Sequence, residues 1–356
     1  MPLRGISLVL AHPRLAQPAI RRAGETIDVE WISPQFASQP AQISLDDGTP
    51  LATGAGTCDG DGICHLAVVL PDFAPGLYGL CVAVGGARDC SPHALAIVAA
   101  YHDPATVVHL SDAHIGFNDA QSIFHDVITS IDAIELAGPA PDFAIFTGDA
   151  ADTGEDDQRA GFLNEIERLN VPIFVVTGNH DYDATGIDDH LLDVGPELDY
   201  AAMYGGIQLV GVSSGQDLDD GNHDSTISES SGPDSSQLTW LATVLTATAP
   251  PTIAFFHHPI YNALFATIGP YSRDALKALV TRDNVRAVLS GHTHISAVFD
   301  ADGNSRGLSL DADTVPSSRW PLHYIASRAT RAPGGYAILH LGTSHVDYRW
   351  VELPSQ

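Results

Sequence analysis

Positive charge is scarce in this sequence: Lys and Arg total 16 against 44 Asp and Glu, and Lys277 is the only lysine. The formal net charge of −28 repels the phosphate backbone of nucleic acids and the surface of anionic membranes, so duplex nucleic acid is not an expected partner. A small anionic ligand would need a strong local positive charge, which a bound metal ion supplies. Solubility or a salty habitat is an alternative explanation of the acidity.

Long hydrophobic runs are also missing. A membrane-spanning helix needs roughly 18 to 20 apolar residues, whereas the longest candidates, such as residues 94–100, are much shorter. Residues 1–11 contain one Arg and a brief apolar run, which makes them a poor signal peptide and more typical of a first strand or a trimmed start. At 356 residues, 44% hydrophobic and 17% charged, the chain has the composition of a packed globular protein with room for two domains.

Cysteine is rare and confined to one region, since all four lie between Cys58 and Cys90. The segment from Cys81 to Cys90 has two adjacent glycines at its centre, which is typical of a two-residue hairpin turn. Counting outward from that turn makes these cysteines a non-hydrogen-bonded pair with Cα atoms about 4.5 Å apart, within reach of a disulfide. Cys58 and Cys64 can close over a short Gly-rich loop. We therefore predict two disulfides and a secreted or periplasmic location; four buried free thiols or a zinc site are the alternatives.

The pattern of apolar residues changes near residue 104. Residues 1–100 hold short apolar runs between Pro, Gly, Asp and Ser clusters, which is typical of an all-β immunoglobulin- or fibronectin-like domain. From 104 to 356, apolar strands alternate with amphipathic helices, which indicates an α/β layered domain. We expect strands at 6–10, 27–32, 41–45, 64–70, 77–84, 94–99, 106–110, 143–146, 173–176, 207–212, 253–256, 285–289, 297–299, 323–326, 336–341 and 345–351. Helices are expected at 121–136, 157–169, 235–245 and 272–280. The acidic segment 216–234 is predicted to be a long surface loop.

Five apolar strands of the second region end in residues that can bind metals. These clusters are Asp112 and His114, Asp149 and Asp152, Asn179 to Asp181, His257 and His258, and His292 and His294. In α/β sheets, ligands gather at the carboxyl ends of strands. In the Asp-x-His and His-x-His pairs the chain is still extended, so both side chains point to one side and can share an ion.

The donor set consists of carboxylate and amide oxygens and imidazole nitrogens, without sulfur. It suits manganese, iron or zinc better than calcium or copper(I). Seven or eight ligands are too many for one tetrahedral ion, and they suit two ions about 3.5 to 4 Å apart that share a carboxylate. The sequence therefore predicts a site for two transition-metal ions.

These motifs resemble the signature of the calcineurin-like metallophosphoesterase family. The pattern DxH, GDxxD, GNHD, H and GHxH occurs in order from Asp112 to His294, and the resemblance extends over about residues 105–345. It implies a four-layer α/β/β/α catalytic domain and a hydrolase that acts on phosphate esters of small molecules.

The resemblance also implies a role for each residue. One metal would bind Asp112, His114 and His294, the second would bind Asn179, His257 and His292, and Asp149 would bridge the two. His257 is preferred to His258 because the ligand in related sequences lies two residues before the proline. A hydroxide bridging the metals would attack phosphorus. His180 would protonate the leaving alkoxide as general acid, with Asp181 orienting it, and Asp152 is expected to brace the site.

Two subgroups of the family share further features with this chain. Residues 147–153 and 257–259 are similar to bacterial class III cyclic-nucleotide phosphodiesterases, whereas the N-terminal all-β region and residues 257–262 resemble purple acid phosphatases. The second resemblance is incomplete, because those phosphatases carry a tyrosine ligand where this chain has Asp152. We expect phosphodiester or cyclic-nucleotide hydrolysis, with phosphomonoester hydrolysis as the alternative. A metal-binding scaffold without turnover is the alternative of another class, and His180 argues against it, since a scaffold needs no proton donor.

Overall fold

The computed structural model describes residues 8–33, 39–59, 62–137, 140–181, 198–215, 232–246, 248–261, 270–282, 284–305, 315–316, 321–326, 329–330, 334–342 and 345–354. The chain divides into two compact units, and the main change from one to the other falls between Tyr101 and His102. The assignment of residues 1–100 and 104–356 as separate domains stays a prediction. No described helix combines the length and the apolar character needed to cross a membrane.

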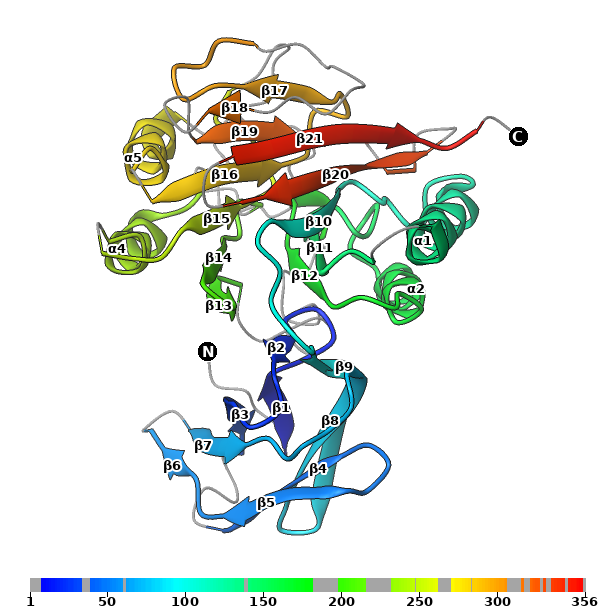
Figure 1. Cartoon of the computed structure of the whole chain (residues 1–356), viewed down its shortest axis with the longest axis vertical. Coiled ribbons are helices and arrows are strands. Elements are labelled where there is room, and N and C mark those ends of the chain that lie inside the picture. The colour runs from blue at the N-terminus through cyan, green and yellow to red at the C-terminus, as the bar shows by residue number, and fades with distance from the viewer. Residues whose placement is uncertain are drawn as a thin grey trace. The chain divides into compact units, whose positions relative to one another are not determined.

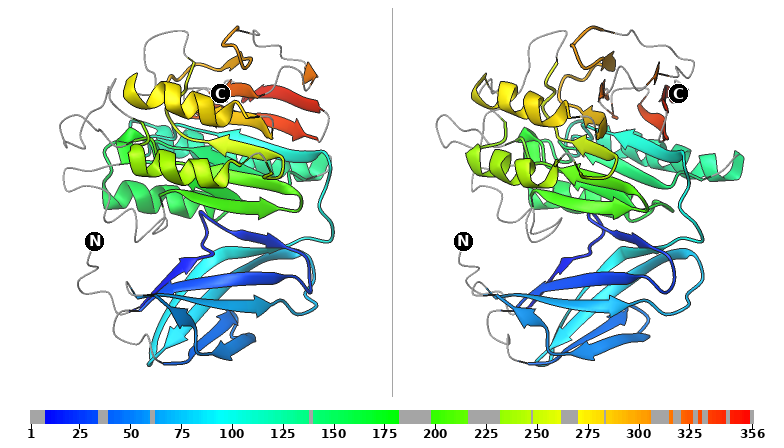
Figure 2. Two further views of the ribbon diagram at one scale, coloured as in Figure 1. Left: turned by 90° about the vertical axis from the view of Figure 1, so that its left-hand side faces the viewer. Right: turned by 60° about the vertical axis from the view of Figure 1, so that its left-hand side comes forward.

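The described elements of the first unit are all strands, as predicted, and they form two sheets (Figure 2). The first sheet has the order β1 (Val9–His12), β3 (Thr26–Ile32), β7 (Ile63–Val69) and β6 (Thr57–Cys58), and the second has the order β2 (Ala19–Arg21), β9 (Ala87–Ile97), β8 (Gly76–Val84), β4 (Ala41–Leu45) and β5 (Pro50–Gly54). Along β3, Ile27, Val29 and Trp31 are buried, which is the alternation of a strand with one face on a core. The two sheets share that core, since Trp31 packs in one cluster with Ile43 and Leu80.

The β8–β9 hairpin has the predicted register. Val84 pairs with Ala87 across the Gly85-Gly86 turn, and Cys81 pairs with Cys90. Both turn glycines have positive φ, 59° and 90°, as a type I′ turn requires. Disulfides join Cys81 to Cys90 and Cys58 to Cys64, with Cα atoms 4.0 and 3.9 Å apart, and no cysteine is free. The disulfide prediction is confirmed, and the two alternatives for these cysteines are excluded.

The second unit contains two six-stranded sheets (Figure 1). One has the order β12 (Ile173–Val176), β11 (Phe143–Thr147), β10 (Ala105–Leu110), β20 (Gly335–Leu341), β21 (His345–Glu352) and β18 (Val315–Pro316); the other has the order β13 (Tyr200–Tyr204), β14 (Ile207–Gly211), β15 (Thr252–Phe255), β16 (Val285–Ser290), β19 (Leu322–Ile325) and β17 (Ala297–Phe299). Strand β10 is parallel to β11, and β15 is parallel to β14 and β16. Strands β11, β12 and β15 are buried along their whole length, as expected for parallel strands covered on both faces.

Helices cover the outer face of each sheet (Figure 1). On the first sheet, Phe124 of α1 (Ala120–Ala137) and Phe162 of α2 (Asp156–Ile166) pack against Phe146 of β11, with ring centroids 6.2 and 4.7 Å apart. On the second sheet, Leu241 of α4 (Ser235–Val244) and Leu276 of α5 (Pro270–Val280) belong to one buried cluster with residues of β14 to β16.

The inner faces of the two sheets pack against each other. Tyr324 of β19 stacks on Tyr348 of β21, with centroids 4.8 Å apart, and Tyr204 of β13 lies 5.1 Å from Phe143 of β11. The order of layers is therefore α/β/β/α, and the predicted fold class is confirmed.

The structure differs from the expected elements in a few places. The helix expected to reach residue 169 ends at Ile166, where Arg168 and Leu169 make tighter bonds to carbonyls three residues back. Strands β2, β5, β6, β13 and β18 were not expected. Of the segment 216–234, only residues 232–234 lie among the described residues.

Candidate metal centre

The loops that follow five strands bring the predicted ligands together. Asp112 and His114 follow β10, Asp149 follows β11 and Asn179 follows β12, whereas His257 follows β15 and His292 and His294 follow β16. Backbone bonds hold the first two loops side by side: the Asp112 N–H donates to the Gly148 carbonyl, and the His114 N–H donates to the Asp149 carbonyl, at 2.9 and 3.0 Å.

Left-handed backbone is concentrated in these loops. Positive φ values between 46° and 68° occur at Asp112, His114, Asp149, His292 and His294. This conformation costs free energy in residues with a Cβ atom, and it persists where the surroundings enforce it, commonly at functional sites. The expectation of an extended chain at the Asp-x-His and His-x-His pairs is therefore wrong, because left-handed turns direct these side chains at the expense of local backbone stability.

The first ligand group contains Asp112, His114, Asp149 and His294, whose candidate ligand atoms all lie within 4.8 Å of one another. His294 Nε2 is 3.1 Å from Asp112 Oδ1, and His114 Nε2 is 3.1 Å from His294 Nε2. Asp149 Oδ2 lies 3.6 Å from His114 Nε2. Two carboxylates and two imidazoles thus face a common point.

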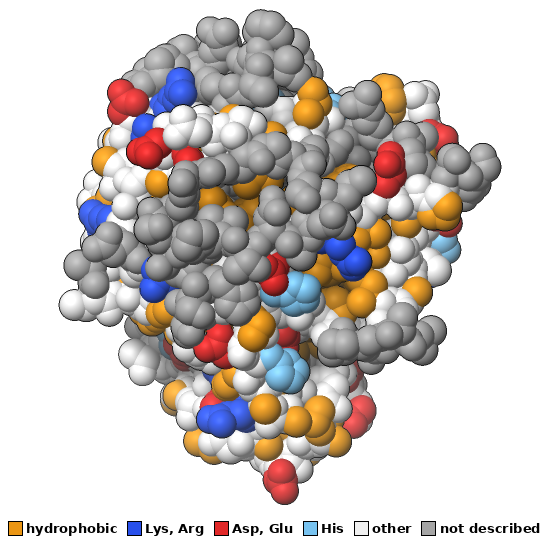
Figure 3. Space-filling view, turned by 45° about the horizontal axis from the view of Figure 1, so that its top comes forward, with side chains coloured by type: hydrophobic (Ala, Val, Ile, Leu, Met, Phe, Trp, Pro, Cys, Tyr) orange, Lys and Arg blue, Asp and Glu red, His pale blue; other side chains and the backbone are white. Residues whose placement is uncertain are grey.

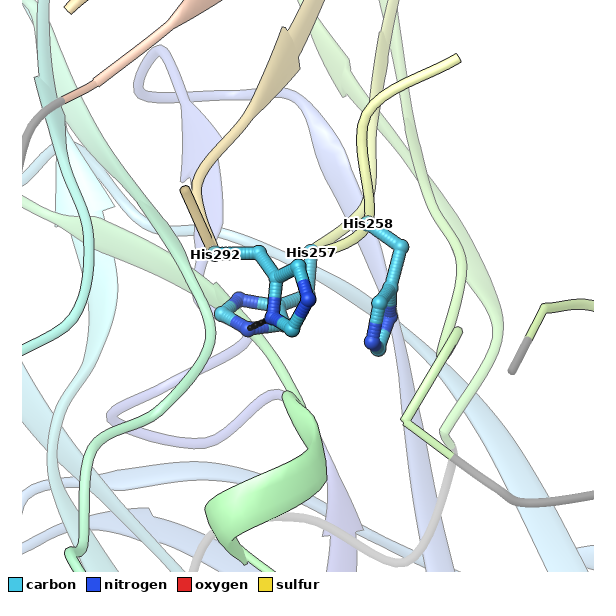
Figure 4. Close-up of side chains that lie close together, drawn as sticks. All are labelled: His257, His258 and His292. Atoms are coloured by element: carbon cyan, nitrogen blue, oxygen red, sulfur yellow. Dashed lines mark hydrogen bonds between the residues drawn. The ribbon is translucent and has the colours of Figure 1, made fainter. Parts of the chain in front are cut away.

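The second group also contacts Asp149. His257 Nε2 is 3.0 Å from Asp149 Oδ2, and His292 Nδ1 is 3.2 Å from His257 Nε2 (Figure 4). His258 also offers a ring nitrogen within 4.8 Å of those of His257 and His292. The single oxygen Asp149 Oδ2 therefore approaches a histidine from each group.

The unmet hydrogen-bonding capacity of this cluster fits bound cations. Asn179 is buried, and both polar atoms of its amide lack a hydrogen-bond partner among the described residues, which is costly unless another partner is bound. Two pairs of imidazole nitrogens face each other at 3.1 and 3.2 Å, and at most one proton can lie between the members of each pair. Lone pairs of oxygen and nitrogen directed at one place are a donor set for a divalent metal.

The charges in the cluster keep Asp112 and His292 deprotonated, whereas they favour a proton on His257. Burial opposes ionisation of Asp112, but the neighbouring His114 and His294 lower the pKa of this carboxyl well below its ordinary value. Burial, reinforced by the charge of His257, lowers the pKa of His292 to about 3. Burial likewise disfavours a charged His257, but the adjacent Asp149 carboxylate outweighs it and raises that pKa to about 9. A cation that displaces this proton would take over the role of neutralising Asp149.

Neighbouring groups fix the orientation of two of the histidines. Asp152 Oδ1 lies 3.1 Å from His114 Nδ1, and the Thr147 carbonyl lies 2.7 Å from His257 Nδ1. In both residues an acceptor at Nδ1 leaves Nε2 as the nitrogen that faces the centre. Asp152 thus braces the site. The Thr147 contact was not predicted, because a main-chain carbonyl leaves no signal in the sequence.

Asp181 makes different contacts from those expected. Its carboxylate accepts four main-chain N–H bonds, from Gly178, Asp149, Ala150 and Ala151, at 2.7 to 3.0 Å. Burial, and then the charge of Asp149, raises the pKa of Asp181 to about 6. Asp181 therefore joins the loop after β11 to the loop after β12.

His180 is oriented by another acceptor. Its Nδ1 lies 2.6 Å from the Asp152 carbonyl, its main-chain N–H donates to Asp149 Oδ1 at 2.9 Å, and its ring lies 4.6 Å from that of His114. The structure thus brings together Asp112, His114, Asp149, His180, His257, His292 and His294, and Asn179 directly precedes His180 in the same loop. Their individual roles stay predictions.

The fold and the donor cluster are those of a metal-dependent phosphoesterase. Residues 105–296 match the model of the calcineurin-like phosphoesterase family. The match covers more than half of the chain, and the chain belongs to this family. Members of this family use divalent metal ions.

Curated relatives include two bacterial proteins. The chain is 31% identical over 209 residues to a cAMP/cGMP dual specificity phosphodiesterase of Mycobacterium tuberculosis. The aligned region covers 53% of this chain and 62% of the relative. It is 30% identical over 213 residues to a probable cyclic nucleotide phosphodiesterase of Rhodococcus erythropolis, covering 53% and 65%. The chain thus spans less than two thirds of the length of these relatives. Among solved structures, a metallophosphoesterase from Sphaerobacter thermophilus has a TM-score of 0.38 at 13% identity, covering 70% of this chain and 89% of that one.

Proposed function

We propose that the protein is a dinuclear metallophosphoesterase that hydrolyses small phosphodiesters, with cyclic nucleotides among the candidate substrates. One observation carries the dinuclear part: Asp149 Oδ2 lies between the two ligand groups, 3.6 Å from His114 Nε2 and 3.0 Å from His257 Nε2. A carboxylate shared in this way is what a two-metal phosphoesterase site requires.

The proposed ligands divide between two ions. Asp112, His114 and His294 would hold one ion, Asn179, His257 and His292 would hold the other, and Asp149 would bridge them. Bound divalent cations of the manganese, iron or zinc type would supply Lewis-acid stabilisation of the phosphoryl oxygens and an activated water. The chain itself holds the donors in place through the Asp152 and Thr147 contacts to the ligand histidines.

His180 is the proposed general acid. The Asp152 carbonyl accepts the Nδ1–H of His180 in either protonation state, so the proton that is exchanged is the one on Nε2. From Nε2 it can pass to the departing alkoxide oxygen. Asp181 contributes by fixing the main chain on both sides of His180 and Asp149, and not by touching the His180 ring.

The preference for diesters rests on the relatives and on exposed apolar groups. The first two curated relatives carry cyclic-nucleotide phosphodiesterase names, and a third, from Arcobacter nitrofigilis, is a probable glycerophosphodiester phosphodiesterase, 35% identical over 83 residues. Two large apolar side chains beside the ligand loops are exposed, Phe117 at 45% and Ile295 at 40%. Phe117 lies three residues after His114, and Ile295 directly follows His294. Figure 3 shows one face of the molecule, on which some histidine and hydrophobic side chains lie next to one another. Such surfaces favour substrates with an apolar or aromatic alcohol group.

The proposed location is outside the cytosol. Two disulfides in one unit indicate an oxidising compartment, since thiols of cytosolic proteins are kept reduced. A secreted or periplasmic protein meets this requirement.

Turnover of two model esters by the manganese-loaded full chain tests the proposal. We expect release of p-nitrophenol from bis-p-nitrophenyl phosphate to exceed that from p-nitrophenyl phosphate, with 3′,5′-cyclic AMP hydrolysed in a parallel assay. Faster release from the monoester would support the phosphomonoesterase alternative. No release from any of them, with two ions per chain measured by elemental analysis, would support the inert scaffold.

A further inference from the structure

His258 is a fully buried histidine beside the metal centre to which no role has been assigned. Its ring centroid lies 4.2 Å from that of His292 and 5.0 Å from that of His257, and the three rings form one cluster (Figure 4). Its Nε2 atom is buried and has no hydrogen-bond partner among the described residues. A buried polar atom without a hydrogen-bond partner costs free energy. Because this atom lies beside a candidate substrate site, an atom of a bound ligand is the partner that we expect for it.

Ser214 determines which nitrogen of His258 carries the proton. The His258 main-chain N–H donates to Ser214 Oγ at 3.0 Å, and the same oxygen lies 3.1 Å from His258 Nδ1. Ser214 is also fully buried, so its single hydroxyl hydrogen needs an acceptor, and among the described residues His258 Nδ1 is the acceptor that its contacts provide. When the hydroxyl donates to Nδ1, the neutral ring carries its proton on Nε2.

A protonated Nε2 cannot be a metal ligand, because its lone pair is committed to the N–H bond. It is instead a hydrogen-bond donor beside a cluster that, loaded with cations, attracts an anion. From these contacts we infer that His258 donates a hydrogen bond from Nε2 to a phosphoryl oxygen of the bound substrate. This inference rests on the proposed function, and it adds a catalytic residue outside the ligand set.

The surroundings of His258 keep this donor in one position. The residue lies three positions after the end of β15 and directly precedes Pro259. The His257 carbonyl accepts the Gly291 N–H at 2.9 Å, which fixes the main chain between the two ligand loops. A preorganised donor of this kind stabilises charge that develops on phosphoryl oxygens, and removal of one such donor typically lowers kcat by roughly 10² to 10³.

Three variants of the manganese-loaded full chain test the inference, with inorganic phosphate as the probe. His258→Phe keeps a ring but removes both nitrogens, His258→Gln retains an amide donor, and Ser214→Ala removes the hydroxyl that sets the tautomer. We expect all three to keep the metal content of the unsubstituted protein by elemental analysis. Calorimetric titration should show phosphate binding weakened roughly tenfold to a hundredfold in His258→Phe and less in the other two.

The outcomes separate the competing explanations. Loss of one metal ion from His258→Phe would make His258 a third imidazole ligand and would overturn the inference. Unchanged phosphate affinity in folded, metal-loaded His258→Phe would also overturn it, as would failure of the unsubstituted protein to bind phosphate. If the unsubstituted protein binds phosphate through His258 but hydrolyses no ester, the proposed function fails while the inference stands.

Discussion

Replacing Gly291 with alanine should displace a proposed metal ligand without altering any ligand side chain. Gly291 lies between the end of β16 and His292, and a Cβ atom built on it would collide with Ser111 Oγ and would lie 2.5 Å from Asp112 Oδ2. Contacts of a Cβ atom under 3.0 Å are essentially never found, and ordinary contact begins at 3.4 Å. The Asp112 carboxylate therefore has to retreat by about 1 Å, a displacement that costs roughly a hundredfold in well-ordered active sites.

The main chain of Gly291 has little freedom to relieve this collision. Its N–H donates to the His257 carbonyl at 2.9 Å, and the next N–H, that of His292, donates to the Asp112 carboxylate at 3.0 and 3.2 Å. We expect Gly291→Ala to weaken manganese binding by about 10- to 100-fold, the range seen when groups that orient ligands are lost. The overpacking itself should lower the free energy of unfolding by about 1–3 kcal/mol.

The assay is calorimetric titration of metal-free protein with manganese, combined with urea unfolding of the metal-free state. Gly206→Ala is a matched control, because a Cβ atom at Gly206 meets nothing within 4 Å. It should bind manganese as the unsubstituted protein does. Unchanged manganese affinity in Gly291→Ala would refute the reasoning, because it would mean that Asp112 can move without loss of metal.

Three further predictions concern other groups. His180→Ala should lower kcat for an alkyl phosphate ester by roughly 10² to 10⁴ and much less for a nitrophenyl ester, whose leaving group needs no proton; equal losses on both would remove His180 from the acid role. Asp149→Asn should reduce manganese content below two ions per chain by elemental analysis, and two full ions would contradict the bridging assignment. Burial, with a smaller contribution from Lys277, lowers the pKa of His323 to about 3, so the folded state binds fewer protons than the unfolded state between about pH 3 and 6.5. The contribution of His323 to the free energy of unfolding is complete above about pH 6.5 and falls by about 3 kcal/mol by pH 4. Urea unfolding of His323→Phe should therefore show a smaller loss of unfolding free energy between pH 7 and 4 than the unsubstituted protein shows. An identical loss in the two proteins would contradict this prediction.

Much of the fold could be predicted because most strands and helices carry an apolar pattern of their own. The strands 143–146 and 173–176 are continuous apolar runs, and the structure has them as β11 and β12. The short strands β6 and β18, of two residues each, have no pattern of that kind and exist because a neighbouring strand pairs with them. Strand β13 did leave a signal that was overlooked: Gly205 and Gly206 form a two-residue turn between paired Tyr204 and Ile207, although only Gly205 has positive φ.

The candidate site was predictable in its members but not in its contacts. Five separate strand ends carry the donors, and their motifs are visible without knowledge of the fold. The contacts of Asp181 could not be foreseen, because three of its four main-chain donors, at residues 149 to 151, lie about thirty positions away in the sequence. The same holds for His180, whose Nδ1 meets the carbonyl of Asp152. Motifs specify which side chains converge, whereas loop geometry decides which main-chain atoms hold them.

The proposed ligands come from both six-stranded sheets. Asp112, Asp149 and Asn179 follow strands of one sheet, and His257, His292 and His294 follow strands of the other. Ions bound between these residues would link the two sheets where they pack against each other. Metal occupancy and folding stability would therefore be coupled. A substitution that loosens the packing between the two sheets, even far from any donor atom, would therefore first weaken metal binding.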